Sequence, residues 1–455
     1  MKFIMSLLLV ISLNSNAATI AVIDSGVDTQ HKDLVNNLWK NLVEVENNGR
    51  DEDRNGYPDD IYGWNFAEGN NLVIDRRYLG TFSADPYLFF EIQGKMMLGT
   101  ASEAEIQWLR DKTKDPAFLQ EMQKFGNFVH GTHVAGITVQ DNQEGKILSV
   151  KLIPTEVNPF FEGLKQYSQK NGDELSQEEK NWRMRILKAG LTTLAGEQMK
   201  LLEEIAAYVG GHNADVANGS FGTGFNQAKM ITDNAFRVIF QKDPTEEESD
   251  ELATFFLDQL ILSGRQMVGA AQDTLFVFAA GNDGSDNDKY PTSPTNIDAD
   301  NVISVAATYK YDFIAPFSNY GEKTVDVAAP GMLINSQIPG NEYLKVSGTS
   351  QAAPFVANIA AQIKDTNKNL SPKDIKKIIM GTVDLKGFLN AKVKAKGIVN
   401  IERALQAARL SLATDIDSAI GEARVNVQDV QTDNTKTNFV DLLNVQPIPL
   451  QSVFR

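Results

Sequence analysis

Short apolar runs rich in β-branched residues alternate along the chain with segments of helical period. Two of the intervening segments, Met199–Val209 and Gln351–Ile363, repeat apolar residues at helical spacing. Continuously apolar strands separated by helices are typical of a parallel sheet that is covered on both faces. We therefore predict an α/β fold with a mostly parallel β-sheet and helices on both faces. The predicted strands are Thr19–Ile23, Leu148–Ile153, Ala214–Ala217, Leu275–Ala280, Val302–Ala307 and Val325–Ala329.

Three polar, helix-like stretches interrupt this alternation, near residues 67–125, 157–197 and 224–265. In the first, Ser102 and Glu105 have capping-box spacing, and Asp115–Pro116 can open a further helix. We interpret the three stretches as helical insertions into one domain, residues 18–410, followed by an acidic, weakly periodic extension at 411–455. The helix after Asp115 is expected to bury Phe118, Leu119, Met122 and Phe125.

The N-terminus has the order of segments found in a secretory signal peptide. Lys2 precedes the apolar run Phe3–Leu13, and small residues follow up to Ala17 and Ala18. A buried first strand is the alternative, but Thr19–Ile23 already supplies that strand. We expect residues 1–17 to be removed and the protein to be exported, to a periplasm or the extracellular space. No later window has the roughly 18 apolar residues of a membrane span.

The composition is that of a folded globular protein and narrows the range of partners. Hydrophobic residues make up 42% of the 455 residues and charged residues 22%. The net charge of −16 repels phosphate backbones and anionic membranes, so nucleic acid is not expected as a partner. The chain has no cysteine, which excludes disulfides and thiolate metal sites. Additional stabilisation must come from packing or from oxygen-ligated metals.

Three separated motifs carry residue types suited to catalysis. Asp24 directly follows a predicted strand, and the carboxyl ends of strands are where open α/β sheets build their sites. His130 and His133 lie in a glycine-rich motif whose small residues would let a helix start against the sheet. Ser350 lies in a turn before an apolar helix, whose dipole favours developing negative charge.

Each motif alone has an ordinary structural interpretation. The aspartate could be a turn residue, the histidines core residues or metal ligands, and the serine a helix cap. The order Asp24, His130, Ser350 changes this balance, because it is the order known from subtilisin. Asn282 lies between the histidine and the serine, at the end of a predicted buried strand. Its amide is a donor suited to an oxyanion.

The sequence resembles the subtilisin-like serine proteases, or subtilases, over roughly residues 19–66, 126–156, 198–223 and 266–408. The similarity is specific because several motifs occur in the family order, although Gln351 stands where the family usually has Met. The motifs are Ala21–Asp28, His130–Gly136, Ala214–Gly222, Phe317–Gly321, Ser347–Pro354 and Gly397–Asn400.

The resemblance implies a subtilisin-like fold and a serine endopeptidase that acts on proteins or peptides through an acyl-enzyme. Ser350 would be the nucleophile, His130 the general base and Asp24 the residue that orients the histidine. Asn282 and the backbone N–H of Ser350 would hold the oxyanion, and His133 would be structural. Substrate main chain would bind as an added strand along Ser220, Phe221 and Gly222. No organic cofactor is implied.

An acidic loop has oxygen-bearing residues at alternate positions around Gly56. Calcium requires oxygen ligands and compensating negative charge, so we predict a structural Ca²⁺ site here. A solvated acidic turn is the alternative, since Tyr62 stands at the twelfth position, where an EF-hand has glutamate. Asp60 or a distant group would have to complete the ligand shell. The predicted ligands are Asp51, Asp53, Asn55, Tyr57 and Asp59.

Other functions were weighed against peptide hydrolysis. A catalytically inactive peptide-binding scaffold would usually have lost a member of the constellation, and a metal hydrolase built on His130 and His133 lacks the HExxH pattern. Within the fold, a narrow-specificity processing protease competes with a broad degradative one. Because only Ala18 and Thr19 separate the expected cleavage site from the first strand, no prosegment is expected. Restraint would then come from the insertions, the C-terminal extension or a separate inhibitory partner.

Overall fold

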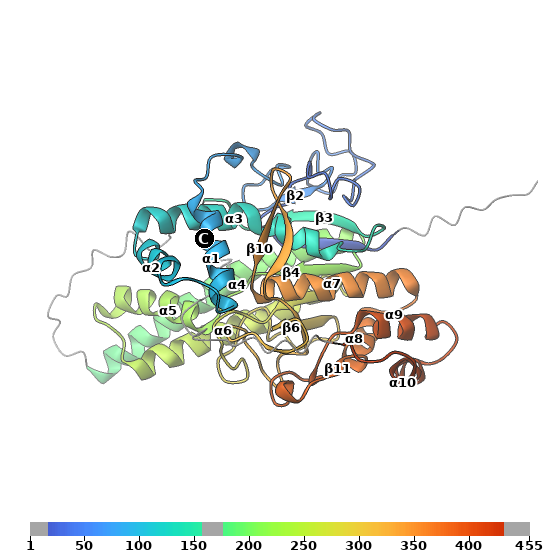
Figure 1. Cartoon of the computed structure of the whole chain (residues 1–455). Coiled ribbons are helices and arrows are strands. Elements are labelled where there is room, and N and C mark those ends of the chain that lie inside the picture. The colour runs from blue at the N-terminus through green and yellow to red at the C-terminus, as the bar shows by residue number, and fades with distance from the viewer. Residues whose placement is uncertain (1–16, 157–175, 432–455) are drawn as a thin grey trace, which may run out of the picture.

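The computed structural model describes residues 17–156 and 176–431, and the predicted signal peptide falls almost wholly outside them (Figure 1). Ten strands of the described residues form one sheet in the order β11-β12-β8-β6-β5-β4-β1-β3-β2, with β7 attached to β6. The pairings along it are parallel except for β11 with β12 and β6 with β7. The strands are β1 Thr19–Asp24, β2 Gly63–Asn65, β3 Lys146–Lys151, β4 Val216–Gly219, β5 Leu275–Ala279, β6 Val302–Tyr309, β7 Phe313–Ile314, β8 Val327–Pro330, β11 Asp384–Leu385 and β12 Gly397–Ile398.

Helices cover both faces of the sheet, which confirms the predicted α/β class. Along the buried strand β1, Ala21 and Ile23 pack into a core with α4, α5 and α6, whereas Ile20 belongs to a second core with α7, α8 and α9. This division follows from the alternation of side chains along a strand. The helices are α1 Asp85–Met97, α2 Glu103–Lys112, α3 Pro116–Thr138, α4 Gln177–Gly211, α5 Phe225–Phe240, α6 Glu246–Gly269, α7 Thr349–Thr366, α8 Pro372–Gly381, α9 Ile401–Leu410 and α10 Ile416–Asn426.

The helix that carries the histidines begins earlier than the small residues around them suggested. Asp115 caps α3 by accepting a hydrogen bond from the backbone N–H of Ala117, and Pro116 is its first residue. One helix then continues through His130, so the expectation of a new helix at that motif was wrong. Phe118 and Phe125 are buried as predicted, but Leu119 is 47% exposed, so its predicted burial was wrong.

The second and third insertions are helical in their described parts. α4 runs without a break from the described part of the second insertion into the predicted segment Met199–Val209, and packs against α6. The third insertion forms α5 and most of α6. Figure 1 shows these helices gathered on the side of the sheet away from α7.

The described part of the C-terminal extension is packed against the domain. Its helix α10 contacts α8 and α9. The buried Arg403 donates to Asp384 at 2.8 Å and to Asp429 at 2.7 Å, which ties residues beyond α10 to the end of the sheet. No helix in the described ranges is long and apolar enough to cross a membrane.

Candidate active site

Asp24 and His130 form a buried pair at the carboxyl end of the sheet. His130 Nδ1 lies 2.7 Å from Asp24 Oδ1, and both side chains are almost inaccessible to solvent. The same carboxylate oxygen accepts the backbone N–H of Ser25 at 2.7 Å. The contact places the imidazole proton on Nδ1 and leaves Nε2 as an acceptor. The second oxygen of Asp24 is buried without a hydrogen-bond partner among the described residues, so its charge remains available to the imidazole.

Two glycines allow close backbone contacts just beyond the end of β1. Gly26 has φ +108°, and a Cβ there would lie 2.0 Å from the carbonyl oxygen of Val73. A Cβ on Gly131 would lie 2.3 Å from the carbonyl oxygen of Gly26. A side chain at either position would force the backbones apart. The close approach of Gly131 in α3 to Gly26 therefore brings His130 near Asp24, while Gly26 makes room for the backbone of Val73.

His133, one turn along α3, is turned toward a different element. Its Nε2 lies 2.9 Å from the carbonyl oxygen of Leu344, in the hairpin formed by β9 Ile334–Ile338 and β10 Glu342–Val346. Burial lowers the pKa of His133 to about 4, so the ring is neutral at ordinary pH. The two histidines have separate partners, which fits a structural role for His133 and does not favour a shared metal.

Ser350 is the second residue of α7, which packs against α3. Its hydroxyl donates to the carbonyl oxygen of Ser220 at 3.3 Å, and Ser220 Oγ donates to the carbonyl oxygen of Ser350 at 3.0 Å. Within the described residues no hydrogen bond joins Ser350 to His130. The structure therefore places the serine on the neighbouring helix with its hydroxyl toward β4.

The amide of Asn282 has a fixed orientation next to Ser350. Its Oδ1 accepts the backbone N–H of Thr349 at 2.9 Å and the Thr349 hydroxyl at 3.0 Å, so Nδ2 must point the other way. Nδ2 has no hydrogen-bond partner among the described residues. A Cβ built on Gly348 would lie 3.5 Å from that Nδ2 and 3.7 Å from the backbone nitrogen of Ser350. Two donors thus lie around one glycine at the start of α7.

The predicted substrate-binding segment directly follows β4. Ser220 is held by Asn218, whose Nδ2 donates to its hydroxyl at 2.9 Å. Phe221 is 1% exposed and packs edge-on against Phe278, so only its backbone could meet a substrate. Gly222 follows it and leaves that backbone free of a side chain.

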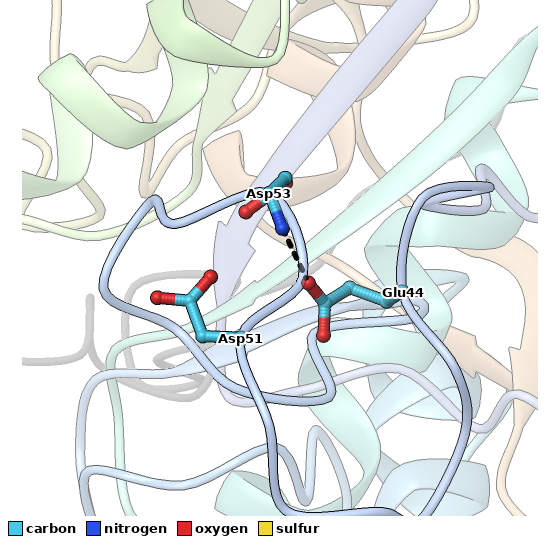
Figure 2. A group of neighbouring side chains, drawn as sticks. All are labelled: Glu44, Asp51 and Asp53. Carbon is cyan, nitrogen blue, oxygen red and sulfur yellow. Dashed lines mark hydrogen bonds between the residues drawn. The ribbon is translucent and has the colours of Figure 1, made fainter.

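The acidic loop brings together two of the five predicted ligands and one residue that was not predicted. Oxygen atoms of Glu44, Asp51 and Asp53 lie within 4.8 Å of one another (Figure 2). Glu44 accepts the backbone N–H of Asp53 at 3.2 Å. Burial opposes the charge of Asp51, but hydrogen bonds from the backbone of Gly56 and Asn55 outweigh it and hold the pKa of its carboxyl below its usual value. None of the three carboxylates forms an ion pair with a lysine or arginine in the described part of the chain.

The side chains of the other three predicted ligands lie outside this group of carboxylates and have hydrogen-bond partners of their own. Both oxygens of Asp59 accept backbone N–H groups of the turn at residues 48–49. The Asn55 amide nitrogen donates to Asp53 and to the fully buried Asp60. The Tyr57 hydroxyl donates to Glu204, and burial together with that carboxylate raises its pKa.

Comparison with known proteins identifies the family. The model of the family described as "Subtilase family" matches residues 15–400, which is most of the chain. The chain belongs to the subtilase family. The resemblance read from the Asp24, His130 and Ser350 motifs is thereby confirmed, and the packed helix α10 of this subtilase lies beyond the matched residues.

Relatives of this subtilase include proteases from a parasite and from a bacterium. Subtilisin-like protease 1 of Plasmodium falciparum (isolate 3D7) is 28% identical over 409 residues, which are 88% of this chain and 45% of that protein. The chain thus spans less than half the length of this relative. Thermophilic serine proteinase of Bacillus sp. (strain AK1) is 47% identical over 96 residues, 21% of this chain and 22% of that protein. Among solved structures, a lanthipeptide protease superposes with TM-score 0.46 at 17% identity, covering 85% of this chain and 88% of that one.

Two residues of the site were not predicted from the sequence. Thr349 was visible in the serine motif, but its role depends on its hydrogen bonds to Asn282, a residue distant in sequence. Glu44 lies outside the alternating acidic pattern, so ligand spacing could not point to it.

Proposed function

We propose that this subtilase is a serine endopeptidase that hydrolyses peptide bonds through an acyl-enzyme. The observation that carries the proposal is the presence of two preorganised sets of groups at the same end of one sheet. One is the buried contact between Asp24 and His130, and the other is the oriented Asn282 amide beside the N–H of Ser350. A peptide-binding scaffold without catalysis would have no need of either.

In the proposed mechanism, Ser350 attacks the scissile carbonyl carbon while His130 Nε2 takes its proton. The hydroxyl must first leave the carbonyl oxygen of Ser220 and turn toward the imidazole by rotation about its Cα–Cβ bond. Asp24 holds the Nδ1 proton and stabilises the charged ring, which then donates a proton to the leaving amine. Water hydrolyses the acyl-enzyme in the reverse sequence of proton transfers.

The negative charge that develops on the substrate oxygen would be held by Asn282 Nδ2 and the N–H of Ser350. Both donors are in place before the reaction, so no reorganisation is required at the moment when charge develops. The N-terminal position of Ser350 in α7 adds the favourable end of the helix dipole.

Substrate main chain would bind along Ser220, Phe221 and Gly222. Because Phe221 is buried, recognition there would rest on backbone hydrogen bonds and would tolerate many side chains. The helical insertions favour some restriction of substrates, so a narrow-specificity processing protease is the second candidate.

A structural calcium ion fits the carboxylates of Glu44, Asp51 and Asp53. Three neighbouring carboxylates without a cationic side chain present the charge and the oxygen atoms that calcium prefers. When bound, the ion would neutralise their repulsion and stabilise the loop. We further propose export after removal of residues 1–17, with activity restrained by the helical insertions, the C-terminal extension or a separate inhibitory partner.

Hydrolysis of an unfolded protein such as reduced casein tests the proposal. The wild-type chain should release peptides and show a burst of product with an ester substrate. Ser350→Ala should abolish both while its melting temperature stays close to wild type, because a hydroxyl removed from a helix start leaves little cavity. Ser418→Ala, on the exposed helix α10, is the matched control and should retain full activity. Undiminished hydrolysis by Ser350→Ala would reject the proposal.

A further inference from the structure

Ala18, which precedes β1, and Thr19, its first residue, lie against two carboxylates that come from distant parts of the chain. The backbone nitrogen of Ala18 is 2.7 Å from Asp365 Oδ1, and that of Thr19 is 3.0 Å from Asp215 Oδ2. Ala18 is fully buried. Asp365 lies in the last turn of α7, and Asp215 precedes β4. The start of the strand that carries Asp24 is therefore held between two acidic side chains.

The charge at this place is not balanced by direct ion pairs. Asp365 lies at the C-terminal end of α7, where the helix dipole disfavours an anion. It pairs with Lys368 at 2.7 Å, whereas Lys364 donates to the carbonyl oxygen of Leu370. Asp215 has no ion pair among the described residues, and burial raises the pKa of its carboxyl. Asp365 thus has one directly paired lysine and Asp215 has none, so no direct contact neutralises the carboxylate of Asp215 within the described residues.

We propose that cleavage after Ala17 creates an α-ammonium group that binds Asp365 and completes this charged cluster. Hydrolysis adds water across the bond between Ala17 and Ala18, leaving a carboxylate on the first and an ammonium group on the second. A signal-peptide-cleaving endopeptidase supplies the catalysis. The backbone nitrogen of Ala18 is an uncharged amide in the uncleaved chain. After cleavage it becomes a positively charged ammonium group at the same place, next to Asp365. Processing thus anchors the start of β1, and with it the strand that positions Asp24.

This inference rests on the proposed removal of residues 1–17, and it has its own titration signature. A free α-amino group has a pKa of about 7.7–8.0, and a neighbouring carboxylate raises it. The ion pair therefore contributes its full stability below about pH 8 and loses it as the pH rises through the raised value. The charged groups around this place are Asp365, Asp215, Lys364 and Lys368.

The test compares two forms of the chain, both with Ser350→Ala to prevent autolysis. One begins at Ala18, and the other carries Gly-Ser before Ala18, which moves the ammonium two residues away. Each is made with and without Asp365→Asn, and Asp417→Asn on the exposed side of α10 serves as the matched control. The α-amino pKa is obtained from the pH dependence of N-terminal acetylation, followed by mass spectrometry. Melting temperatures are recorded at pH 6 and pH 10.

In the form that begins at Ala18 we expect an α-amino pKa at least one unit above 8, and about tenfold slower acetylation near pH 7.5. Asp365→Asn should remove the shift and lower the melting temperature at pH 6 more than at pH 10. In the form that carries Gly-Ser before Ala18, the α-amino pKa should be the usual value of about 7.7–8.0, and Asp365→Asn should not change it.

An unshifted pKa in the form that begins at Ala18 would overturn the inference. So would an equal loss of stability from Asp365→Asn in both forms, because that result indicates only a neutral hydrogen bond. If Asp365→Asn does not fold, the comparison of the two unsubstituted forms decides. N-terminal sequencing of the exported protein separates this inference from the proposed peptidase activity. If an active peptidase begins at a residue other than Ala18, the ammonium site is rejected and the proposed activity is not.

Discussion

Thr349 is expected to act on catalysis only through Asn282. The Thr349 hydroxyl donates to Asn282 Oδ1 at 3.0 Å and accepts the backbone N–H of Gly281 at 3.1 Å. Thr349→Val keeps the shape of the side chain and the backbone N–H bond to Asn282 but removes the hydroxyl. The amide would then be held by one hydrogen bond in place of two, so Nδ2 would lose part of its fixed direction.

The size of the effect follows from the bonds that are lost. Thr349→Val removes two hydrogen bonds, of which only the one to Asn282 orients the amide, whereas the one from Gly281 should affect mainly the melting temperature. One neutral hydrogen bond contributes about 0.5–1.5 kcal/mol, so Thr349→Val should lower kcat by about 2- to 10-fold. Asn282→Ala removes the donor itself and should lower kcat by about 10²–10³ with little change in KM, a magnitude known from subtilisin and carried over with the family. Because Thr349 works through Asn282, the double variant should have the kcat of Asn282→Ala.

The assay is steady-state hydrolysis of a fluorogenic peptide by the four proteins of this double-mutant cycle. Melting temperatures are measured alongside, since Asn282→Ala also leaves donors of Thr349 without an acceptor. The reasoning would be refuted by independent losses that multiply in the double variant, because Thr349 would then act by another route. A loss confined to KM would instead assign the pair to substrate binding.

Further predictions concern pH and calcium. The pKa of His133 is about 4 in the folded protein and about 6.5 in the unfolded chain. As the pH falls from 6.5 to 4, the unfolded chain therefore binds a proton first, and the free energy of unfolding decreases by about 3 kcal/mol. His133→Gln, whose amide can still donate to Leu344, should flatten that part of the unfolding curve; an unchanged slope would contradict this. Removal of calcium by a chelator should lower the melting temperature, since a ligand at 100 times its Kd stabilises by about 2.7 kcal/mol. Asp53→Ala should abolish this response to the chelator, whereas the exposed Glu46→Gln should keep it. If the melting temperature of the wild type does not respond to the chelator, the calcium site is rejected and the loop is a solvated acidic turn.

The parallel sheet could be predicted because its strands are short, apolar and bounded by turns. The strand before Asp24 and the helix after Ser350 were both placed this way: Asp24 is the last residue of β1, and Ser350 is the second residue of α7. The family match confirms the resemblance to subtilases that these motifs indicated.

Features that depend on tertiary contacts could not be predicted. Helix boundaries near His130 were misplaced because Gly131 suggested a helix start, whereas its lack of a side chain serves contact with Gly26. Leu119 follows the apolar pattern of α3 but lies on a face that the described residues leave about half exposed. Glu44 joins the acidic loop only through the folding of the chain around it. Spacing along a sequence carries no information of this kind.

The proposed mechanism depends on Ser350 as the nucleophile. Incubation of the purified protein with a fluorophosphonate, followed by digestion and mass spectrometry, locates the serine that forms a covalent adduct. The account predicts one adduct, on Ser350, with labelling abolished in Ser350→Ala and strongly slowed in His130→Ala. An adduct on a different serine, or undiminished labelling in Ser350→Ala, would contradict it.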